Sequence, residues 1–328
     1  MAIDRIHLRV DEAHEHSERA LRGIGYDPEE ARILADHMID AALCGYEYSG
    51  LAKILNIPEH RRFKLPRHPM KAIRETEVSA LYDGGNNVGM LAMYYATRAA
   101  IEKAEQRGFS VVGVTNSWMS GRSAYYCEMI AKADLVGIHT ASSARSVAPF
   151  GGARAALGTN PIAFGMPSSQ GPVVFDMGTS AFMGTELALR ERLGQLLPEG
   201  VAIDSAGRPT RDPSAARQGA LLPFGGYKGY GLGFIVQALG VLAGSAIAPD
   251  GDDGYLFVVF RPDLLIPLDQ FKREVTLLVD RIKSTPRAPG AEEIRIPGER
   301  AFKSRERLLR EGIEVDRLVY DALAALHG

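Results

Sequence analysis

The chain of 328 residues carries 38 Lys and Arg against 40 Asp and Glu, a formal net charge of −2, and 46% of its residues are hydrophobic. The near-neutral balance excludes a protein that binds nucleic acid through a basic face, because phosphate affinity needs clustered positive charge. The hydrophobic content excludes a disordered chain, and no apolar stretch reaches the roughly 20 residues that cross a bilayer.

The two cysteines, Cys44 and Cys127, show the spacing of neither a metal site nor a disulfide framework, so we expect no metal and a reducing compartment. The first ten residues carry charges throughout and lack the apolar core of a signal peptide. We therefore expect a cytoplasmic protein whose partners are small molecules, with no nucleic acid and no membrane partner.

The N-terminal third is predicted to be helical. A helix over 11–22 precedes a second helix that begins after Asp27, whose carboxylate caps it, with Pro28 at the first helical position. Small and apolar residues at three- and four-residue spacing form its buried stripe, which includes His37 as a core residue. Gly45 is expected to end this helix.

The middle of the chain alternates strands and helices, which is typical of an α/β or mixed α+β fold. Helices are expected over 88–106 and 123–132. Strands are expected at 78–82, 109–115, 135–140, 162–166 and 173–175. The polar stretch 194–219, rich in Gly and Pro, is predicted to be a long surface loop.

The C-terminal part is predicted to return to helices after one strong strand at 255–260. A glycine-rich helix over 228–243 precedes this strand, and an amphipathic helix over 269–283 follows it. Two further helices, over 300–311 and 316–326, are expected to close the chain.

No standard nucleotide or catalytic motif is present: there is no early GxGxxG, Walker loop, GxSxG elbow or HExxH. The glycines at 229, 231 and 233 lie inside a helical pattern and indicate close helix packing. What remains is a series of short, polar, glycine-rich corners, at 116–121, 149–152, 158–161, 176–180, 223–229 and 297–300. Exposed backbone N–H groups at such corners suit a pyrophosphate, and glycine permits close approach.

In this order and spacing, the corners resemble those of the malate/L-lactate dehydrogenase family that lacks a Rossmann fold. That family includes sulfolactate and ureidoglycolate dehydrogenases and reductases of cyclic imines such as Δ1-piperideine-2-carboxylate. The likeness covers about 18–315 and is most specific at 151–161, 176–180 and 225–232. It implies a homodimer in which residues 76–244 form a mixed-sheet, NAD(P)-binding lobe. Residues 1–75 and 245–328 would form a helical lobe for substrate binding and dimerisation.

The resemblance also implies site residues. The expected cofactor-binding set is Ser143, Asp176, Met177, Gly178, Thr179, Ser180, Tyr227, Lys228, Gly298, Glu299 and Arg300. The expected substrate-binding set is Lys53, Asn116, Met119 and Thr159. NADPH is favoured over NADH, because Arg122, Arg145 and Arg154 are available for a ribose 2′-phosphate.

Two histidines of the family pattern are replaced. The signature Arg-Gly-x-x-Ser-His-Gly-x-x-Arg, in which the histidine donates a proton and the last arginine binds the substrate carboxylate, matches 44–53 here. Tyr48 stands for the serine, Ser49 for the histidine and Lys53 for the arginine. In the corner Asn-Ser-x-His-Phe-Gly, the histidine is Met119. Trp118 and Met119 are expected to shape an apolar pocket that holds no imidazole.

These replacements favour reduction of a C=N bond in a small, cyclic, carboxylate-bearing imine. A protonated imine needs no strong acid, whereas a positioned acid speeds ketone reduction roughly 10²–10⁴-fold. The expected catalytic residues are Tyr48, Ser49, Lys53 and Asp176, of which Asp176 orients the catalytic group. One alternative is a 2-oxo acid/2-hydroxy acid dehydrogenase that uses water or Tyr48, with a pKa lowered by Lys53, as proton donor. The other is a catalytically silent nucleotide-binding homologue.

Overall fold

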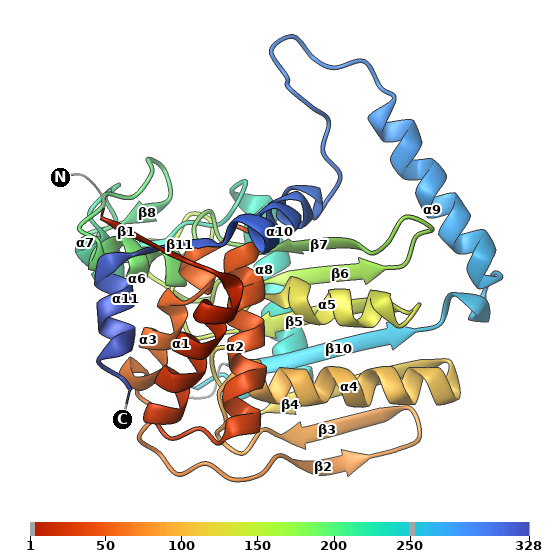
Figure 1. Cartoon of the computed structure of the whole chain (residues 1–328), viewed down its shortest axis with the longest axis horizontal. Helices are drawn as coiled ribbons and strands as arrows, with labels where there is room; N and C mark the ends of the chain where they lie inside the picture. Colours follow the sequence, from red (N-terminus) through yellow and green to blue (C-terminus); the bar gives the residue numbers. More distant parts are fainter. Residues whose placement is uncertain (1–3, 249–252, 328) are drawn as a thin grey trace.

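The computed structural model describes residues 4–248 and 253–327. A mixed seven-stranded sheet runs through the molecule in the order β2-β3-β4-β10-β5-β6-β7 (Figure 1). Its strands are β2 (Lys71–Glu75), β3 (Ser79–Asp83), β4 (Phe109–Thr115), β5 (Val136–Ser142), β6 (Ile162–Met166), β7 (Val173–Met177) and β10 (Gly254–Phe260). β3 and β4 pair in parallel, and the other neighbours in this sheet pair antiparallel. This order differs from the parallel, doubly wound sheet of a Rossmann fold, as expected.

Different helices cover the two faces of the sheet. α4 (Gly89–Arg107) and α5 (Ser123–Lys132) pack on one face, and α8 (Tyr227–Leu242) packs on the other (Figure 1). In β4, Val112 and Val114 belong to the core beneath α4, whereas a side chain at Gly113 between them would meet Ala243 just after α8. Both faces of the central strands are therefore covered, which explains why these strands read as continuous apolar runs.

The glycines of α8 allow this helix to approach its neighbours closely. A Cβ at Gly240 would lie 2.0 Å from the Ser142 hydroxyl, and one at Gly233 would lie 2.9 Å from the Thr179 hydroxyl. A Cβ at Gly229 would lie 2.2 Å from the carbonyl oxygen of Phe224. The prediction of packing glycines is confirmed at Gly229 and Gly233.

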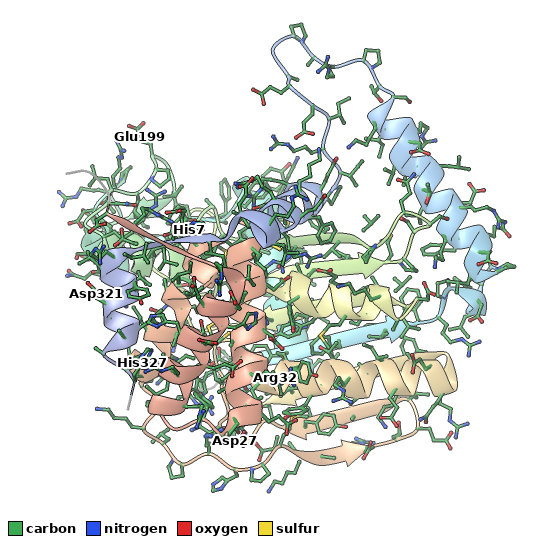
Figure 2. All side chains as sticks on the ribbon, viewed as in Figure 1. His7, Asp27, Arg32, Glu199, Asp321 and His327 are labelled. Atoms are coloured by element: carbon green, nitrogen blue, oxygen red, sulfur yellow. The ribbon has the colours of Figure 1, made fainter. Side chains whose placement is uncertain are left out.

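The apolar core of the N-terminal helices also includes the C-terminal helix. α1 (Val10–Gly23), α2 (Pro28–Leu43), α3 (Ala52–Glu59) and α11 (Arg317–Ala324) share one apolar cluster. β1 (Arg5–Leu8) and β11 (Ile313–Asp316) pair beside them, although no local pattern had predicted these strands. At the start of α2, the Asp27 carboxylate accepts the backbone N–H of Glu30 at 2.9 Å, as predicted (Figure 2).

The stretch expected to be a long surface loop is partly ordered and buried. It contains β8 (Ala202–Ile203) and α7 (Pro213–Gln218), and with α6 (Gly184–Arg192) and β9 (Ala220–Leu221) it builds a small unit. Leu197, Val201 and Ala216 lie in its core. The loop prediction over 194–219 is therefore only partly right, because a few apolar residues between many polar ones pack into a shared core.

The amphipathic helix predicted at 269–283 is present as α9 (Leu268–Lys283), but none of its residues is buried. Figure 1 shows α9 along the edge of the molecule, followed by an extended connection to α10 (Glu299–Glu311). The short helix η2 (Pro262–Leu264) links β10 to α9. The apolar side chains of α9 are therefore only partly covered, and Leu277, Leu278 and Ile282 are exposed.

The predicted lobe boundary at residue 245 does not match the sheet. β10 follows that boundary, yet it is hydrogen-bonded between β4 and β5 at the centre of the sheet. Residues 245–328, predicted to belong to the helical lobe, therefore contribute a central strand to the sheet, because the sequence of a strand does not indicate which remote strands it pairs with. Across the described ranges, none of the helices combines the length and apolar character that crossing a bilayer requires.

Candidate functional site

Two adjoining cavities lie at the end of the sheet where β4 and β5 finish and β10 begins. The larger, of about 500 Å³, is bordered by α3, the corner after β4, the segment after β5 and the start of α6. The smaller, of about 120 Å³, is bordered by Tyr46, the start of α5 and the end of β7. Ser49, Gly121, Pro161 and Met183 line both cavities, so the two are neighbouring parts of one site.

Lys53 places an isolated positive charge in the wall of the larger cavity. Its surface is 4% exposed, and its amine forms no ion pair or hydrogen bond within the described residues. Burial lowers the pKa of Lys53 from 10.5 to about 8, because desolvation disfavours the charged form. A buried cation without a partner is costly, so this position suits a ligand that brings a negative charge.

The corner after β4 has an unusual backbone where it meets the cavities. Met119, which lines the larger cavity, has a φ of +60°, in the left-handed region that a side chain disfavours. Gly121 has a φ of +79°, and a Cβ there would lie 2.2 Å from Nε2 of His37. That nitrogen accepts the backbone N–H of Arg122 at 2.9 Å, so His37 supports the corner from the core, as predicted.

Asn116 was expected to bind substrate, but it lines neither cavity. Its amide oxygen accepts a hydrogen bond from Arg62, and its amide nitrogen donates to Asp83 at 2.7 Å. The local turn therefore uses both polar ends of the Asn116 side chain.

The short helix η1 (Glu47–Ser49) contains the two residues expected at the proton-donor position and directs them to different parts of the site. Ser49 lies where the cavities meet, whereas Tyr48 lines only the smaller one. Burial raises the pKa of Tyr48, and Tyr46 and Glu186 add to the rise. The expectation that Lys53 lowers the Tyr48 pKa is therefore wrong, because desolvation dominates there.

Asp176 lines the smaller cavity and also caps α5. Its Oδ2 accepts the backbone N–H of Ala124 at 2.8 Å. Burial raises the pKa of Asp176, while the hydrogen bond from Ala124 and the charge of Arg122 oppose the rise. Met177 and Gly178 line the same cavity, so the corner that follows β7 faces the site as expected.

Of the other predicted residues, two line the site and two support it. Ser143 and Thr159 line the larger cavity. Thr179 and Ser180 are buried, and their hydroxyls donate to the carbonyl oxygens of Thr159 at 3.1 Å and Phe182 at 2.7 Å. These two side chains therefore hold the corner after β7 in shape.

Five residues of the expected cofactor set lie outside both cavities: Tyr227, Lys228, Gly298, Glu299 and Arg300. Tyr227 is 64% exposed at the start of α8. Glu299 forms ion pairs with two lysines, which use its carboxylate at the start of α10. The Arg300 guanidinium lies 4.8 Å from the ring centre of Tyr46, which borders the smaller cavity.

The start of α6 offers backbone N–H groups to the larger cavity. Gly184 and Thr185 line that cavity, and no side chain caps this helix. The N-terminus of a helix attracts phosphate through these groups and the helix dipole. Arg122 does not serve the expected 2′-phosphate, because it is buried and its guanidinium binds Asp40 at 2.5 Å.

Sequence reasoning missed His60, which lines the larger cavity. It follows the last residue of α3, and its ring stacks on Trp118 with centroids 4.3 Å apart and planes inclined by 1°. The expectation of a pocket without imidazole is therefore wrong. The available signal was the spacing of Lys53, Asn56 and His60, which places them on one face of a helix.

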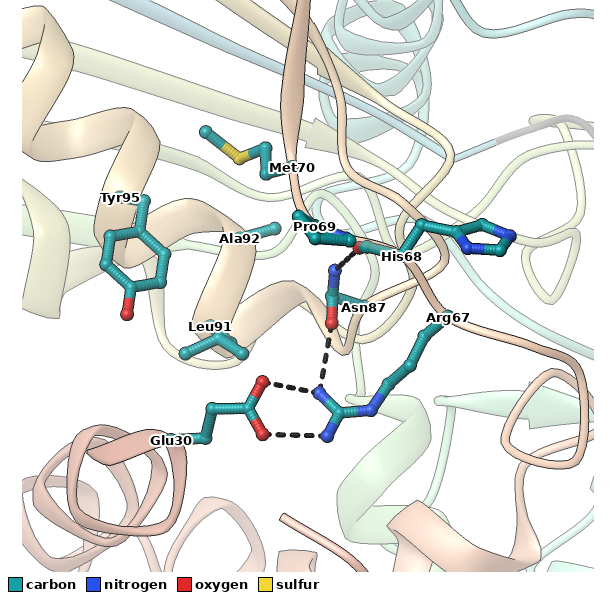
Figure 3. A pocket seen from close by; sticks show the side chains of 9 residues that line it. All are labelled: Glu30, Arg67, His68, Pro69, Met70, Asn87, Leu91, Ala92 and Tyr95. Carbon is teal, nitrogen blue, oxygen red and sulfur yellow. Dashed lines mark hydrogen bonds and ion pairs between the residues drawn. The ribbon is translucent and has the colours of Figure 1, made fainter. Parts of the chain in front are cut away.

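A further cavity, of about 610 Å³, lies at the start of α2 and α4 and has no free charge to offer (Figure 3). Arg67 forms a two-point ion pair with Glu30, at 2.6 and 2.7 Å, and donates to Asn87 at 3.1 Å. Asn87 in turn donates to the carbonyl oxygen of His68 at 2.7 Å. Within the described ranges, no group of three or more His, Cys, Asp or Glu side chains is placed to hold a metal.

Comparisons with known proteins agree with this fold. The family model described as malate/L-lactate dehydrogenase matches residues 8–324. The chain is 33% identical to malate/(S)-sulfolactate dehydrogenase of Methanothermus fervidus over 93% of this chain and 92% of that protein. It is 30% identical to Delta(1)-pyrroline-2-carboxylate reductase 2 of Burkholderia multivorans over 99% of this chain and 98% of that one. A dehydrogenase structure from Sinorhizobium meliloti superposes with a TM-score of 0.91 at 29% identity, with 99% of each chain covered.

Proposed function

The chain belongs to the malate/L-lactate dehydrogenase family, whose members are oxidoreductases, and from this premise we propose a specific reaction. The protein is an NAD(P)H-dependent reductase that transfers hydride to the C=N bond of a small, cyclic, carboxylate-bearing imine. The observation that carries the proposal is Lys53, a buried amine without an ionic partner in the wall of the larger cavity. Its charge complements a substrate carboxylate beside the reacting bond.

The residues of the site fit a pyridine dinucleotide. The uncapped start of α6 at Gly184 and Thr185 suits a phosphate, and Ser143 lies on the same cavity. The corner from Asp176 to Gly178 would hold the nicotinamide end beside Ser49. When bound, the reduced cofactor supplies the hydride. We propose that the mixed sheet with its corners, including β10, is the nucleotide-binding part of the protein.

The residues at the two replaced histidine positions favour an imine, because none of them is a ready proton donor. Met119 replaces the histidine of the corner after β4, and burial raises the pKa of Tyr48. A cyclic imine that arrives protonated becomes a neutral amine on hydride transfer, so the site has no proton to supply. The relative named as a pyrroline-carboxylate reductase supports this substrate class.

A 2-oxo acid is the second candidate substrate. The pKa of Lys53, about 8, would let this amine give up a proton near neutral pH. The relative named as a malate/(S)-sulfolactate dehydrogenase supports this alternative. In that reaction the chain would need one cation both to bind a carboxylate and to supply a proton, which ranks it second.

We propose NADPH as the preferred coenzyme, with NADH possible. Arg145 and Arg154 belong to the segment between Ser143 and Thr159, both of which line the larger cavity. A cation from this segment would pair with a 2′-phosphate. We also propose a cytoplasmic location, which the two free and buried cysteines support.

We propose that the protein forms a homodimer through α8 and α9. Phe234 and Leu242 of α8 are 57% and 69% exposed, and Leu277 of α9 is 58% exposed. Exposed apolar side chains such as these are typical of an association surface. A second copy is the occupant that this surface fits, because α9 already extends along the edge of the molecule (Figure 1).

The test measures oxidation of NADPH and NADH with cyclic imino acids and with 2-oxo acids. We expect turnover of Δ1-piperideine-2-carboxylate or Δ1-pyrroline-2-carboxylate, with NADPH preferred. Turnover of 2-oxo acids alone would reverse the ranking. Coenzyme binding by calorimetry without turnover of any compound would indicate the catalytically silent alternative, and no binding would overturn the proposal.

A further inference from the structure

His60 lies in one row with Lys53 along the larger cavity. Lys53, Asn56 and His60 follow each other at intervals of three and four residues, and all three line that cavity. Seven residues correspond to about 10 Å along a helix axis. Lys53 and His60 therefore reach the cavity from opposite ends of this row and are placed to bind separate groups of one ligand.

The His60 ring is held in one orientation by two neighbours. One face stacks on Trp118, which is itself fixed by a hydrogen bond from its ring N–H to the carbonyl oxygen of Asn86 at 3.1 Å. The Nδ1 atom of His60 accepts the backbone N–H of Arg62 at 3.3 Å, so the proton of the neutral ring is on Nε2. No described residue accepts a hydrogen bond from Nε2.

The surroundings keep the ring neutral. Burial and, to a smaller extent, the charges of Arg61 and Arg62 together lower the pKa of His60 from 6.5 to about 4. The other charged residues in the cavity wall are Lys53, Glu59, Arg217 and Asp253. Near pH 7 the ring is therefore a neutral hydrogen-bond donor.

We propose that His60 determines substrate specificity by donating a hydrogen bond from Nε2 to a second acceptor group of the substrate. That group lies at the end of the substrate away from the carboxylate that Lys53 binds. The inference rests on the proposed function, because it takes Lys53 as the carboxylate site. It favours an acid with two polar ends over one with an apolar tail.

The test compares matched ligands in wild type, His60→Phe and His60→Gln. Each pair sets a dicarboxylate against a monocarboxylate of the same length: 2-oxoglutarate against 2-oxopentanoate, and 2-oxoadipate against 2-oxohexanoate. The measured quantity is kcat/KM, or the dissociation constant where a compound is not turned over. Wild type should prefer the dicarboxylate of each pair at least tenfold, mainly through KM, because a buried donor left unpaired penalises the other ligand. The variant His60→Phe keeps a ring stacked on Trp118 and should reduce the preference for the dicarboxylate to within twofold. The variant His60→Gln should restore part of that preference.

A second measurement does not depend on activity. Trp118 is the single tryptophan, and a protonated imidazole quenches the fluorescence of a stacked indole, so its emission reports the titration of His60. The dicarboxylates should raise the midpoint by at least half a pH unit, the monocarboxylates should not, and the transition should be absent in His60→Phe. His7→Gln, at an exposed histidine bonded to Glu314, should behave as wild type in both measurements.

The outcomes separate the two proposals. If no substrate is reduced, the proposed function fails and the fluorescence titration still decides the role of His60. An equal dicarboxylate preference in wild type and His60→Phe, or a midpoint that dicarboxylates leave unchanged, would overturn the role of His60. So would a loss of coenzyme affinity in His60→Phe in place of the loss of substrate selectivity.

Discussion

At the scale of single residues, Lys53 links binding to a cost in stability. Lys53→Met removes the cation and with it a charge-assisted hydrogen bond worth roughly 1.5–3 kcal/mol, so kcat/KM for a carboxylate-bearing substrate should fall about 10- to 100-fold. With the pKa of Lys53 at about 8, kcat/KM of wild type should also decline as the pH rises above 8, because the amine then loses its proton. Initial rates of coenzyme oxidation check both points, with Lys53→Arg as the control that keeps its charge at high pH.

The same substitution should make the protein more stable. Because the pKa of Lys53 in the folded protein lies below 10.5, the folded state binds fewer protons than the unfolded state between about pH 8 and 10.5. Wild type therefore gains stability as the pH rises through this window. At pH 7, Lys53→Met should raise the free energy of unfolding by an amount on the order of 2 kcal/mol. Urea denaturation at pH 7 and pH 10 measures the difference, and equal stabilities at pH 7 would contradict the burial argument.

The variant Tyr48→Phe tests whether reduction of a 2-oxo acid uses Tyr48 of η1 as the proton donor. Burial raises the pKa of Tyr48, and the side chain lies in the smaller cavity. Tyr48→Phe should therefore change kcat for a cyclic imine less than threefold. A fall of 100-fold or more with a 2-oxo acid, measured under the same conditions, would instead identify Tyr48 as a proton donor and favour the dehydrogenase alternative.

At the scale of helices and strands, the cap of α2 stabilises the fold from a position outside the two site cavities. Asp27 and Glu30 form a reciprocal capping box, with backbone-to-carboxylate hydrogen bonds of 2.9 and 3.1 Å. Asp27→Ala should lower the free energy of unfolding by about 1 kcal/mol and leave kcat and KM unchanged. Asp27→Asn, which keeps an acceptor oxygen, should lose less of the free energy of unfolding. Denaturation curves of wild type and both variants measure these free energies.

Elements with a local signal were predicted well, and elements that depend on remote partners were not. The helix expected over 88–106 is present as α4, which ends at Gly108 with a φ of +83°. β1 and β11 come from opposite ends of the chain, so neither carries a pattern that names the other. His60 was overlooked because it stands in a polar run after α3, and its stacking on Trp118 depends on the remote corner after β4; the helical spacing from Lys53 was the one local signal.

At the scale of the whole molecule, the apolar surface on α8 and α9 should control association. Phe234→Glu combined with Leu277→Glu places two charges on this surface and should convert a dimer into a monomer. Light scattering after gel filtration measures the mass, and Arg98→Glu on α4 serves as the control. A wild type that is already monomeric at micromolar concentration would contradict the homodimer.

The central place of β10 also bears on how the protein is made. About three quarters of the polypeptide is synthesised before residues 254–260 exist, yet β4 and β5 are not hydrogen-bonded to each other without them. The nascent chain therefore holds two incomplete half-sheets whose unpaired edges invite wrong pairing. We expect translation arrested at residue 250 to yield a protease-sensitive product that engages chaperones, and release of only some 20 further residues to bring protection.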